Sequence, residues 1–260
     1  MKIGFIGTGK ITNSCVRSLT GKGHSIMITE RNIDISSTLS ELFEEVVVAT
    51  AQSVVEESDL VCLALRENVT DEVLSSLSFK KNQSIISFML GVNLNRLLNL
   101  CTPAYDIAIT IPLPMIEHGN CPLPVYPASE SLKTVFGDKN SIIDLPSEDA
   151  LVPYFAATAI LSSSLAQLNV AKKWLENHVD TPEAAEKYLI SLMAGTYSSL
   201  KIDGQDRINQ ALVSLSSKGG LNAQLRNHMK KEGCEDALYN GFLQLGDCLL
   251  YTSPSPRDPH

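Results

Sequence analysis

The sequence predicts an α/β fold, a doubly wound and mainly parallel sheet of the Rossmann type, followed by an all-helical domain. Short runs rich in Val, Ile and Leu alternate with amphipathic stretches over the first half of the chain, which is the pattern of parallel strands joined by crossover helices. A glycine-rich turn follows the first of these runs. Beyond Pro146 the apolar runs stop and long helical segments take their place.

Strands and helices alternate in order along the first part. Nearly continuous apolar runs are typical of strands covered on both faces, and they predict strands at residues 2–6, 25–29, 46–49, 60–65, 84–88 and 107–111. The amphipathic stretches predict helices at residues 10–20, 38–43, 53–57 and 70–77. Prolines gathered between residues 112 and 127 exclude a helix and predict a loop over the edge of the sheet. A helix at 129–136 and a strand at 141–144 follow.

The second part contains helical patterns without strands. We expect helices at residues 154–178, 181–199, 205–216, 221–231 and 235–249. Thr181, Pro182 and Glu183 form a favourable helix start, with an N-cap, a fixed first φ and an acid in the first turn. Trp174 and Tyr188 fit apolar helical stripes, where we expect the core of a dimer.

Composition and charge narrow the range of partners. A net charge of −8 argues against nucleic acid, because phosphate binding needs clustered Lys and Arg. The six cysteines form no Cys-x-x-Cys pair and lie at no metal-ligand spacing, so we expect no metal site, and Cys62 is expected to be a buried apolar side chain. The first strand leaves no room for a signal peptide. No apolar stretch approaches the roughly 20 residues of a membrane span, so we expect a cytoplasmic protein without a membrane partner.

The most informative motif lies between the first strand and the first helix, in the turn formed by Gly7, Thr8, Gly9, Lys10 and Ile11. Gly7 permits a tight turn, Gly9 lets the backbone approach a pyrophosphate, and the helix start offers unpaired N–H groups to the anion. Thr12 stands where a third glycine is common, and a small residue there still lets helix and strand pack closely. This order of elements predicts a bound dinucleotide.

The end of the second strand bears on the choice between NAD and NADP. An acid here binds the ribose 2′-OH of NAD, whereas an arginine pairs with the 2′-phosphate of NADP. Both kinds are present, as Glu30 and Arg31. Because Arg31, Asn32 and Thr29 together offer several donors to a phosphate, we predict NADP, and Glu30 leaves NAD possible.

The chain resembles the pyrroline-5-carboxylate reductases over nearly its whole length. Four segments similar to family motifs are Gly-Phe-Ile-Gly-Thr-Gly at 4–9, the strand at 58–66, the segment at 85–92 and the proline turn at 111–114. The fifth and most specific covers residues 216–222, Ser-Ser-Lys-Gly-Gly-Leu-Asn, and is similar to the family's Thr-Ser-Pro-Gly-Gly-x-Thr.

The resemblance implies a homodimer, or a higher homo-oligomer, built through interleaved helices, and reduction of the C=N bond of 1-pyrroline-5-carboxylate to proline with NAD(P)H. It implies further cofactor contacts from Ala64, Leu65 and Arg66. Catalytic roles fall on Ser217 and Asn222, and contacts with the imine substrate on Lys218, Gly219, Gly220 and Leu221.

Four positions depart from the family's pattern. Glu67 and Lys218 replace prolines, Leu113 replaces an asparagine, and Asn222 replaces the threonine that is associated with the ring nitrogen. The Asn222 amide can form hydrogen bonds but is a poor proton donor. Two other functions therefore stay open: a 3-hydroxyacid-type dehydrogenase on the same plan, and a catalytically weak NADP-binding sensor or scaffold dimer.

The predicted domains follow from the change of rhythm. Residues 1–148 are expected to form the NAD(P)-binding Rossmann domain, and residues 149–249 the helical dimerisation and substrate domain. Residues 250–260 carry three prolines among small polar residues, and we expect a disordered tail of non-native sequence there.

Overall fold

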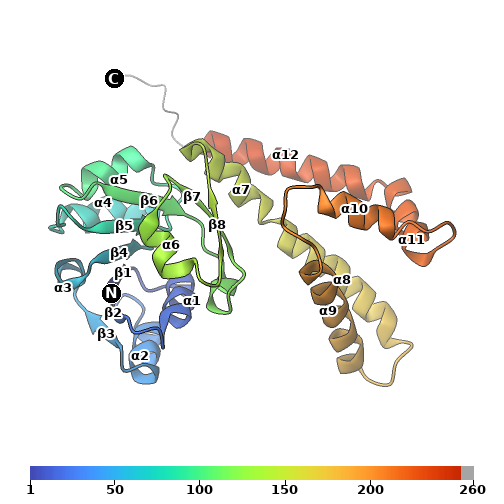
Figure 1. The fold of residues 1–260 in the computed structure, drawn as a ribbon, viewed down its shortest axis with the longest axis horizontal. Coiled ribbons are helices and arrows are strands. Elements are labelled where there is room, and N and C mark those ends of the chain that lie inside the picture. The colour runs from blue at the N-terminus through green and yellow to red at the C-terminus, as the bar shows by residue number, and fades with distance from the viewer. Residues whose placement is uncertain (253–260) are drawn as a thin grey trace. The chain divides into compact units, whose positions relative to one another are not determined.

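The computed structural model describes residues 1–252, with side chains described to residue 246. The chain divides into two compact units, Met1–Phe155 and a second that begins at Ala156 (Figure 1). The division falls a few residues beyond the expected boundary at 148/149. The reason is the start of helix α7 (Leu151–Ala157), whose first residue Leu151 is buried in the core of the first unit.

Within the described residues, eight strands form one sheet in the order β3-β2-β1-β4-β5-β6-β7-β8. All neighbouring pairs are parallel except β6 and β7, which confirms the mainly parallel, doubly wound class. The strands are β1 (Lys2–Ile6), β2 (Ser25–Thr29), β3 (Val46–Ala49), β4 (Leu60–Leu63), β5 (Ser84–Ser87), β6 (Asp106–Thr110), β7 (Pro122–Tyr126) and β8 (Ser141–Asp144).

Two apolar cores lie on the two faces of this sheet. Side chains from α1, α2 and α6 pack in one core with Ile3 and Phe5 of β1, and side chains from α3, α4 and α5 pack in the other with Ile6. The alternation along β1 is why its residues read as a continuous apolar run. The helices are α1 (Lys10–Leu19), α2 (Ile33–Leu42), α3 (Ala51–Glu57), α4 (Glu67–Ser75), α5 (Leu94–Leu100) and α6 (Glu130–Phe136).

In the first unit, α2 and α5 differ most from the sequence prediction. Helix α2 begins five residues before the predicted start at residue 38, because the side chain of Asn32 caps it by accepting a hydrogen bond from the Ile35 N–H at 3.3 Å. Helix α5 was not predicted at all. It begins at an equivalent cap, where Asn93 accepts from the Arg96 N–H at 2.8 Å.

The proline-rich segment contains a strand where a loop was expected. The carbonyls of Cys121 and Val125 accept hydrogen bonds from N–H groups of β8 and its continuation, at 3.1 and 3.0 Å. The alternate residues of β7, Pro122 and Pro124, therefore present their missing N–H groups to the side of β6, whose pairing reaches only the last two residues of β7. A short 3₁₀ helix, η1 (Pro114–Glu117), precedes this strand.

The second unit is helical in its described part, as predicted. The predicted helix at 154–178 is broken into α7 and α8 (Ile160–Glu176). Thr181 caps α9 (Pro182–Ser198), accepting from the Ala184 N–H at 3.2 Å. The remaining helices are α10 (Arg207–Ser214), α11 (Leu221–Lys231) and α12 (Cys234–Thr252). Because α12 runs through Thr252, the predicted tail at 250–260 starts inside a helix, and its residues 253–260 lie outside the described part.

One helical segment bears on the expectation about apolar stretches. In the described part of the chain, the helical segment Glu148–Glu176 is long and apolar enough to cross a membrane by length and composition, and 6% of its most apolar window is buried. Ser, Thr and Gln interrupt its apolar residues without adding charge, so no continuous apolar run marks it in the sequence. Core helices of soluble proteins meet the same test.

Candidate functional site

The glycine turn after β1 has a backbone that only glycine fits. Gly7 has φ +97°, and a Cβ atom there would lie 2.3 Å from the carbonyl oxygen of Ala64. The neighbouring N–H of Ala64 donates to the Ile6 carbonyl at 2.8 Å. The turn is therefore pressed against the segment that leaves β4, and a side chain at this position would separate the two.

Three threonines hold the turn in place. The Gly7 N–H donates to Oγ1 of Thr29 at 3.0 Å, and Thr8 Oγ1 donates to the Thr29 carbonyl. Thr12 Oγ1, fully buried, donates to the Gly7 carbonyl at 2.6 Å. Thr12 thus does more than replace a third glycine. The Thr29 hydroxyl accepts from Gly7 inside the protein and keeps its own proton, so a bond from it to a cofactor phosphate stays a prediction.

The turn leaves an open cradle at the start of α1. Gly9 is the N-cap with extended backbone, no protein atom lies within 4 Å of the position its Cβ would take, and no side chain caps the helix. The first turn holds no acid, and Lys10 at its first position is exposed. Uncapped N–H groups, the helix dipole and open space together fit a pyrophosphate.

The end of β2 supplies one free cation. Arg31 is exposed and forms no ion pair or hydrogen bond through its side chain within the described residues. The adjacent Glu30 is exposed as well. Asn32 is occupied as the cap of α2, so its predicted contact with the cofactor is reduced to the free end of its amide.

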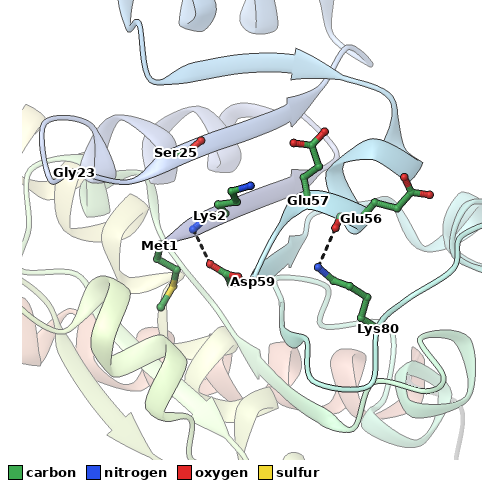
Figure 2. A pocket seen from close by; sticks show the side chains of 8 residues that line it. All are labelled: Met1, Lys2, Gly23, Ser25, Glu56, Glu57, Asp59 and Lys80. Atoms are coloured by element: carbon green, nitrogen blue, oxygen red, sulfur yellow. Dashed lines mark hydrogen bonds between the residues drawn. The ribbon is translucent and has the colours of Figure 1, made fainter.

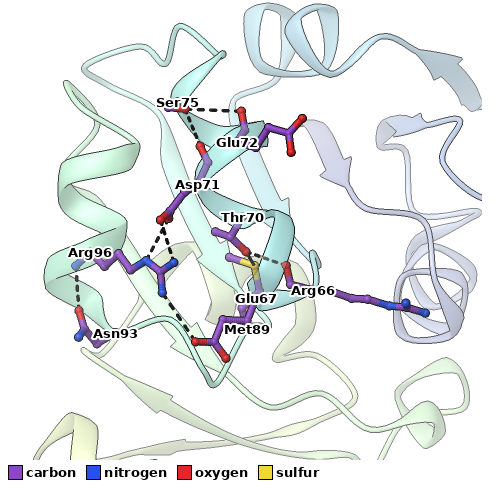
Figure 3. Close-up of polar contacts among 9 residues, drawn as sticks. All are labelled: Arg66, Glu67, Thr70, Asp71, Glu72, Ser75, Met89, Asn93 and Arg96. Carbon is purple, nitrogen blue, oxygen red and sulfur yellow. Dashed lines mark hydrogen bonds and ion pairs between the residues drawn. The ribbon is translucent and has the colours of Figure 1, made fainter. Parts of the chain in front are cut away.

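The segment after β4 brings a second cation to the same edge of the sheet. Ala64 is half-buried and Leu65 is buried, so their backbone rather than their side chains faces the edge. The Arg66 carbonyl accepts from Thr70 Oγ1 at 3.0 Å, whereas its guanidinium extends away from the neighbouring charged side chains (Figure 3). The structure thus brings the predicted cofactor residues together at the carboxyl ends of β1, β2 and β4.

Next to Arg66 lies a group of charged side chains that the sequence did not predict. Arg96 on α5 donates from Nε and one terminal nitrogen to the two carboxylate oxygens of Asp71, at 3.0 and 2.9 Å (Figure 3). Its other terminal nitrogen lies 3.8 Å from Oε1 of Glu67, the first residue of α4. Hydrogen bonding to Asp71 is the main cause that raises the pKa of Arg96. The i, i+4 spacing of Glu67 and Asp71 was visible in the sequence, but the partner came from an unpredicted helix.

The predicted substrate motif belongs to the second unit and is exposed. Gly219 has φ +75°, and the Gly220 N–H donates to the Ser217 carbonyl at 2.9 Å, which closes a turn before α11. Gly220 caps α11 without a side chain, and the Ser217 hydroxyl lies against it, 2.3 Å from where a Gly220 Cβ would be. Lys218, Leu221 and Asn222 are exposed around this helix start.

A hollow of about 590 Å³ lies elsewhere, at the amino ends of the strands (Figure 2). Lys80 Nζ donates to the carbonyls of Glu56 and Ser58 at 3.0 and 2.8 Å, and Gln83 adds bonds to Val55 and Ser58. These contacts satisfy the last carbonyls of α3 and are structural. Dinucleotides bind at the carboxyl ends of such strands, so this hollow is not the cofactor site.

The four buried thiols, those of Cys15, Cys62, Cys101 and Cys121, are not part of a reactive centre. Cys62 is fully buried, as predicted, and burial raises its pKa; burial raises the pKa of Cys101 to about 12. Buried thiols of this kind are poor nucleophiles. Among the described residues, no three His, Cys, Asp or Glu side chains gather as metal ligands.

Comparison with known proteins finds relatives of the segment that contains this site. The family model described as NADP oxidoreductase, coenzyme F420-dependent, matches residues 2–91, the part that contains the glycine turn, Arg31 and Arg66. Pyrroline-5-carboxylate reductase from Arabidopsis thaliana is 30% identical over 102 residues. Over this segment the chain is similar to the pyrroline-5-carboxylate reductases. The matched segment spans 37% of this chain and 37% of the Arabidopsis enzyme.

Solved structures of these reductases share the fold along nearly the full length. A pyrroline-5-carboxylate reductase from Coxiella burnetii superposes with a TM-score of 0.80, at 18% identity, over 97% of this chain and 98% of that one. The Plasmodium falciparum pyrroline carboxylate reductase with NADP bound gives 0.78, at 12% identity and the same coverage. At these identities the likeness establishes the fold of both units, and the predicted fold class is confirmed.

Proposed function

We propose that the chain is an NADPH-dependent reductase that acts on the C=N bond of a small cyclic imine, as in the pyrroline-5-carboxylate reductases to which it is related. The observation that carries the proposal is the anion cradle at Gly9, which is open, uncapped and flanked by cations inside a sequence match to an NADP oxidoreductase family. The first substrate to test is 1-pyrroline-5-carboxylate, which the curated relative is named for.

The preference for NADP over NAD rests on the free arginine at the end of β2. A guanidinium that has no carboxylate partner can pair with a 2′-phosphate in bidentate fashion. Arg31 meets this condition among the described residues. Glu30 is also exposed and could accept from a ribose hydroxyl, so the preference is a matter of degree.

The protein itself is proposed to position the substrate and the cofactor and to supply hydrogen-bond donors and charged groups that hold them. When bound, the reduced nicotinamide supplies the hydride that the imine carbon accepts. The uncapped start of α11, with the Ser217 hydroxyl beside it, offers donors to a substrate carboxylate. The Gly220 N–H is used inside the turn, so these donors are the Leu221 and Asn222 amides and the Ser217 hydroxyl. Asn222 and Lys218 supply further polar contacts.

The helical unit is proposed to pair with a second copy of the chain. In its described part, from 156 to 246, the buried side chains are those of Ala156 and Ala185, while Trp174 and Tyr188 are 64% and 60% exposed. Exposed apolar side chains at this density are typical of a protein interface. We propose a homodimer or higher homo-oligomer in the cytoplasm, without nucleic acid or membrane as a partner.

The deciding experiment measures NADPH oxidation by the purified protein with racemic 1-pyrroline-5-carboxylate, alongside NADPH and NADH affinity by fluorescence. The proposal expects tighter binding of NADPH and turnover at about 1–1000 per second. Tight NADPH binding without reduction of this substrate or of 1-pyrroline would overturn the reductase and favour the sensor or scaffold function.

Ser217→Ala tests the motif in the second unit. Loss of the hydroxyl beside the α11 start removes one donor to the substrate, so kcat/KM for 1-pyrroline-5-carboxylate is expected to fall about tenfold, with NADPH affinity unchanged. Ser214→Ala is a matched control, because the Ser214 hydroxyl donates to the Ala211 carbonyl of its own helix at 2.7 Å. Wild-type kinetics in Ser217→Ala would remove the motif from the active site.

A further inference from the structure

The topology of the sheet indicates which loops lie toward the reacting end of a bound dinucleotide. The pyrophosphate fits the start of α1, and the adenosine ribose is recognised at the end of β2. Because β1 lies between β2 and β4, the nicotinamide half extends to the other side, over the carboxyl ends of β4 and β5. The residues that follow these two strands, Arg66–Glu67 and the loop before α5, are therefore those nearest the chemistry.

Glu67 presents a carboxylate at this position. Its side chain is 57% exposed, and Oε2 lies 2.6 Å from where a Cβ on Gly91 would be, in the loop after β5. Gly91 thus leaves room for the carboxylate to rest directly on the backbone of that loop. The contact between Thr70 Oγ1 and Met89 Sδ at 3.6 Å joins the same two segments. Glu67 is consequently held at the edge rather than free in solvent (Figure 3).

The charged side chains around Glu67 do not fully neutralise its carboxylate. Its one ion-pair partner in the described residues, Arg96, already makes two hydrogen bonds to Asp71 and lies 3.8 Å from Glu67. Glu148, which accepts from the Leu94 N–H at 2.8 Å, adds another acid at the start of α5. The adjacent Arg66 extends away from the group (Figure 3). Of the two cations, only Arg96 therefore faces these acids, and it is shared between Glu67 and Asp71.

An imine is reduced as its protonated form. The C=N carbon of an iminium accepts the hydride, the π electron pair becomes the lone pair of the amine nitrogen, the nicotinamide is oxidised, and the amine then takes a proton from water. A carboxylate within a few ångströms favours the charged form of such a nitrogen. No strong acid is needed for this step.

We propose that Glu67 is a catalytic residue whose carboxylate pairs with the protonated nitrogen of the cyclic imine and holds the substrate as the iminium. The assignment rests on the proposed reductase function. It gives a role to an exposed carboxylate at the carboxyl end of β4 that cofactor binding does not use.

Binding tests the assignment without turnover. NADP⁺-saturated protein is titrated calorimetrically with pyrrolidine, a cation at neutral pH, and with cyclopentanol, a neutral ring of similar size. Glu67→Gln is expected to weaken pyrrolidine binding about tenfold and to leave cyclopentanol unchanged. Glu72→Gln is the matched control, since it removes the same charge from the same helix at a side chain that points away from Glu67 (Figure 3).

The pH dependence of reduction gives a second measurement. Wild-type kcat for 1-pyrroline is expected to fall as the pH rises past the apparent pKa of the bound imine, and Glu67→Gln should move this fall about one pH unit lower. If Glu67→Gln and Glu72→Gln bind pyrrolidine equally and share the wild-type profile, the assignment is overturned. If pyrrolidine binding depends on Glu67 but no imine is reduced, the cation site stands and the reductase function falls.

Discussion

His24, just before β2, is a half-buried histidine whose Nδ1 atom is buried without a hydrogen-bond partner in the described residues. Burial is the main cause that lowers its pKa, with the N-terminal amine and Lys22 acting in the same direction. The unfolded chain, with an ordinary histidine pKa of about 6.5, then binds a proton more readily than the folded one. Folding stability should therefore be lost as the pH falls through and below about 6.5.

The measurement is urea unfolding at pH 7.5 and 5.5 for the wild type and for His24→Asn. The variant cannot titrate at this position, so its unfolding midpoint should fall less on acidification than that of the wild type. His178→Asn serves as the control, because this histidine is exposed and contacts only Trp174 through its ring among the described side chains. Equal losses in wild type and His24→Asn would show that His24 does not contribute.

Single residues were predictable where backbone geometry demands one residue type, and less so where side chains meet across the fold. Gly7 and Gly9 were assigned from the sequence because a turn between strand and helix requires them. Thr29 was taken as a donor to the cofactor, since its sequence neighbours are polar. Its bond to the Gly7 N–H joins residues 22 positions apart, which no local pattern reveals.

A substitution at the start of α1 can change cofactor binding without changing the stability of the fold. Gly9→Asp introduces a side chain into open space on an extended backbone, and Asp is a favourable N-cap, so the protein should keep its melting temperature. The carboxylate would occupy the place of the pyrophosphate and repel it. NADPH affinity should fall at least about 100-fold, measured by fluorescence titration.

Gly9→Ser is the neutral control, for which a smaller loss of affinity is expected. Gly7→Ala gives the opposite pattern, because its Cβ would strike the Ala64 carbonyl and the backbone φ is positive, so loss of stability should precede any loss of binding. Unchanged NADPH affinity in Gly9→Asp would refute the assignment of the phosphate site.

Helices and strands were predictable where the pattern of apolar residues is clear. They were missed where an N-cap or the pairing with a neighbouring strand determines the element. Strands such as β1 and β2 match their predicted residues because buried parallel strands are marked by continuous apolar runs. Helix α5 is short, and the one clear sign of it in the sequence is Asn93, its N-cap. Strand β7 carries prolines that normally argue against a strand, and only its pairing on the β8 side explains them.

For the whole molecule, the fold class and the order of the two units were predictable from the sequence, because the strand, glycine turn and helix of a Rossmann unit form a local pattern. The oligomeric state could be stated only as an expectation. A helical unit whose side chains are mostly exposed cannot obtain its stability from a core of its own, since burial of apolar surface is the dominant favourable term in folding. Its apolar side chains include Leu165, Val170, Trp174, Tyr188 and Tyr197, all more than half exposed.

We therefore expect a mass of at least twice 28.3 kDa by sedimentation equilibrium at micromolar concentration. Trp174→Glu combined with Tyr188→Glu places charges where apolar side chains should meet, and should weaken association at least about 100-fold while lowering the melting temperature of the helical unit. Ile33→Glu, a change at an apolar side chain on α2 that is 66% exposed, is the control and should leave the mass unchanged. A wild-type monomer with a cooperatively melting helical unit would refute the dimer, because the exposed helices would then be stable without a partner.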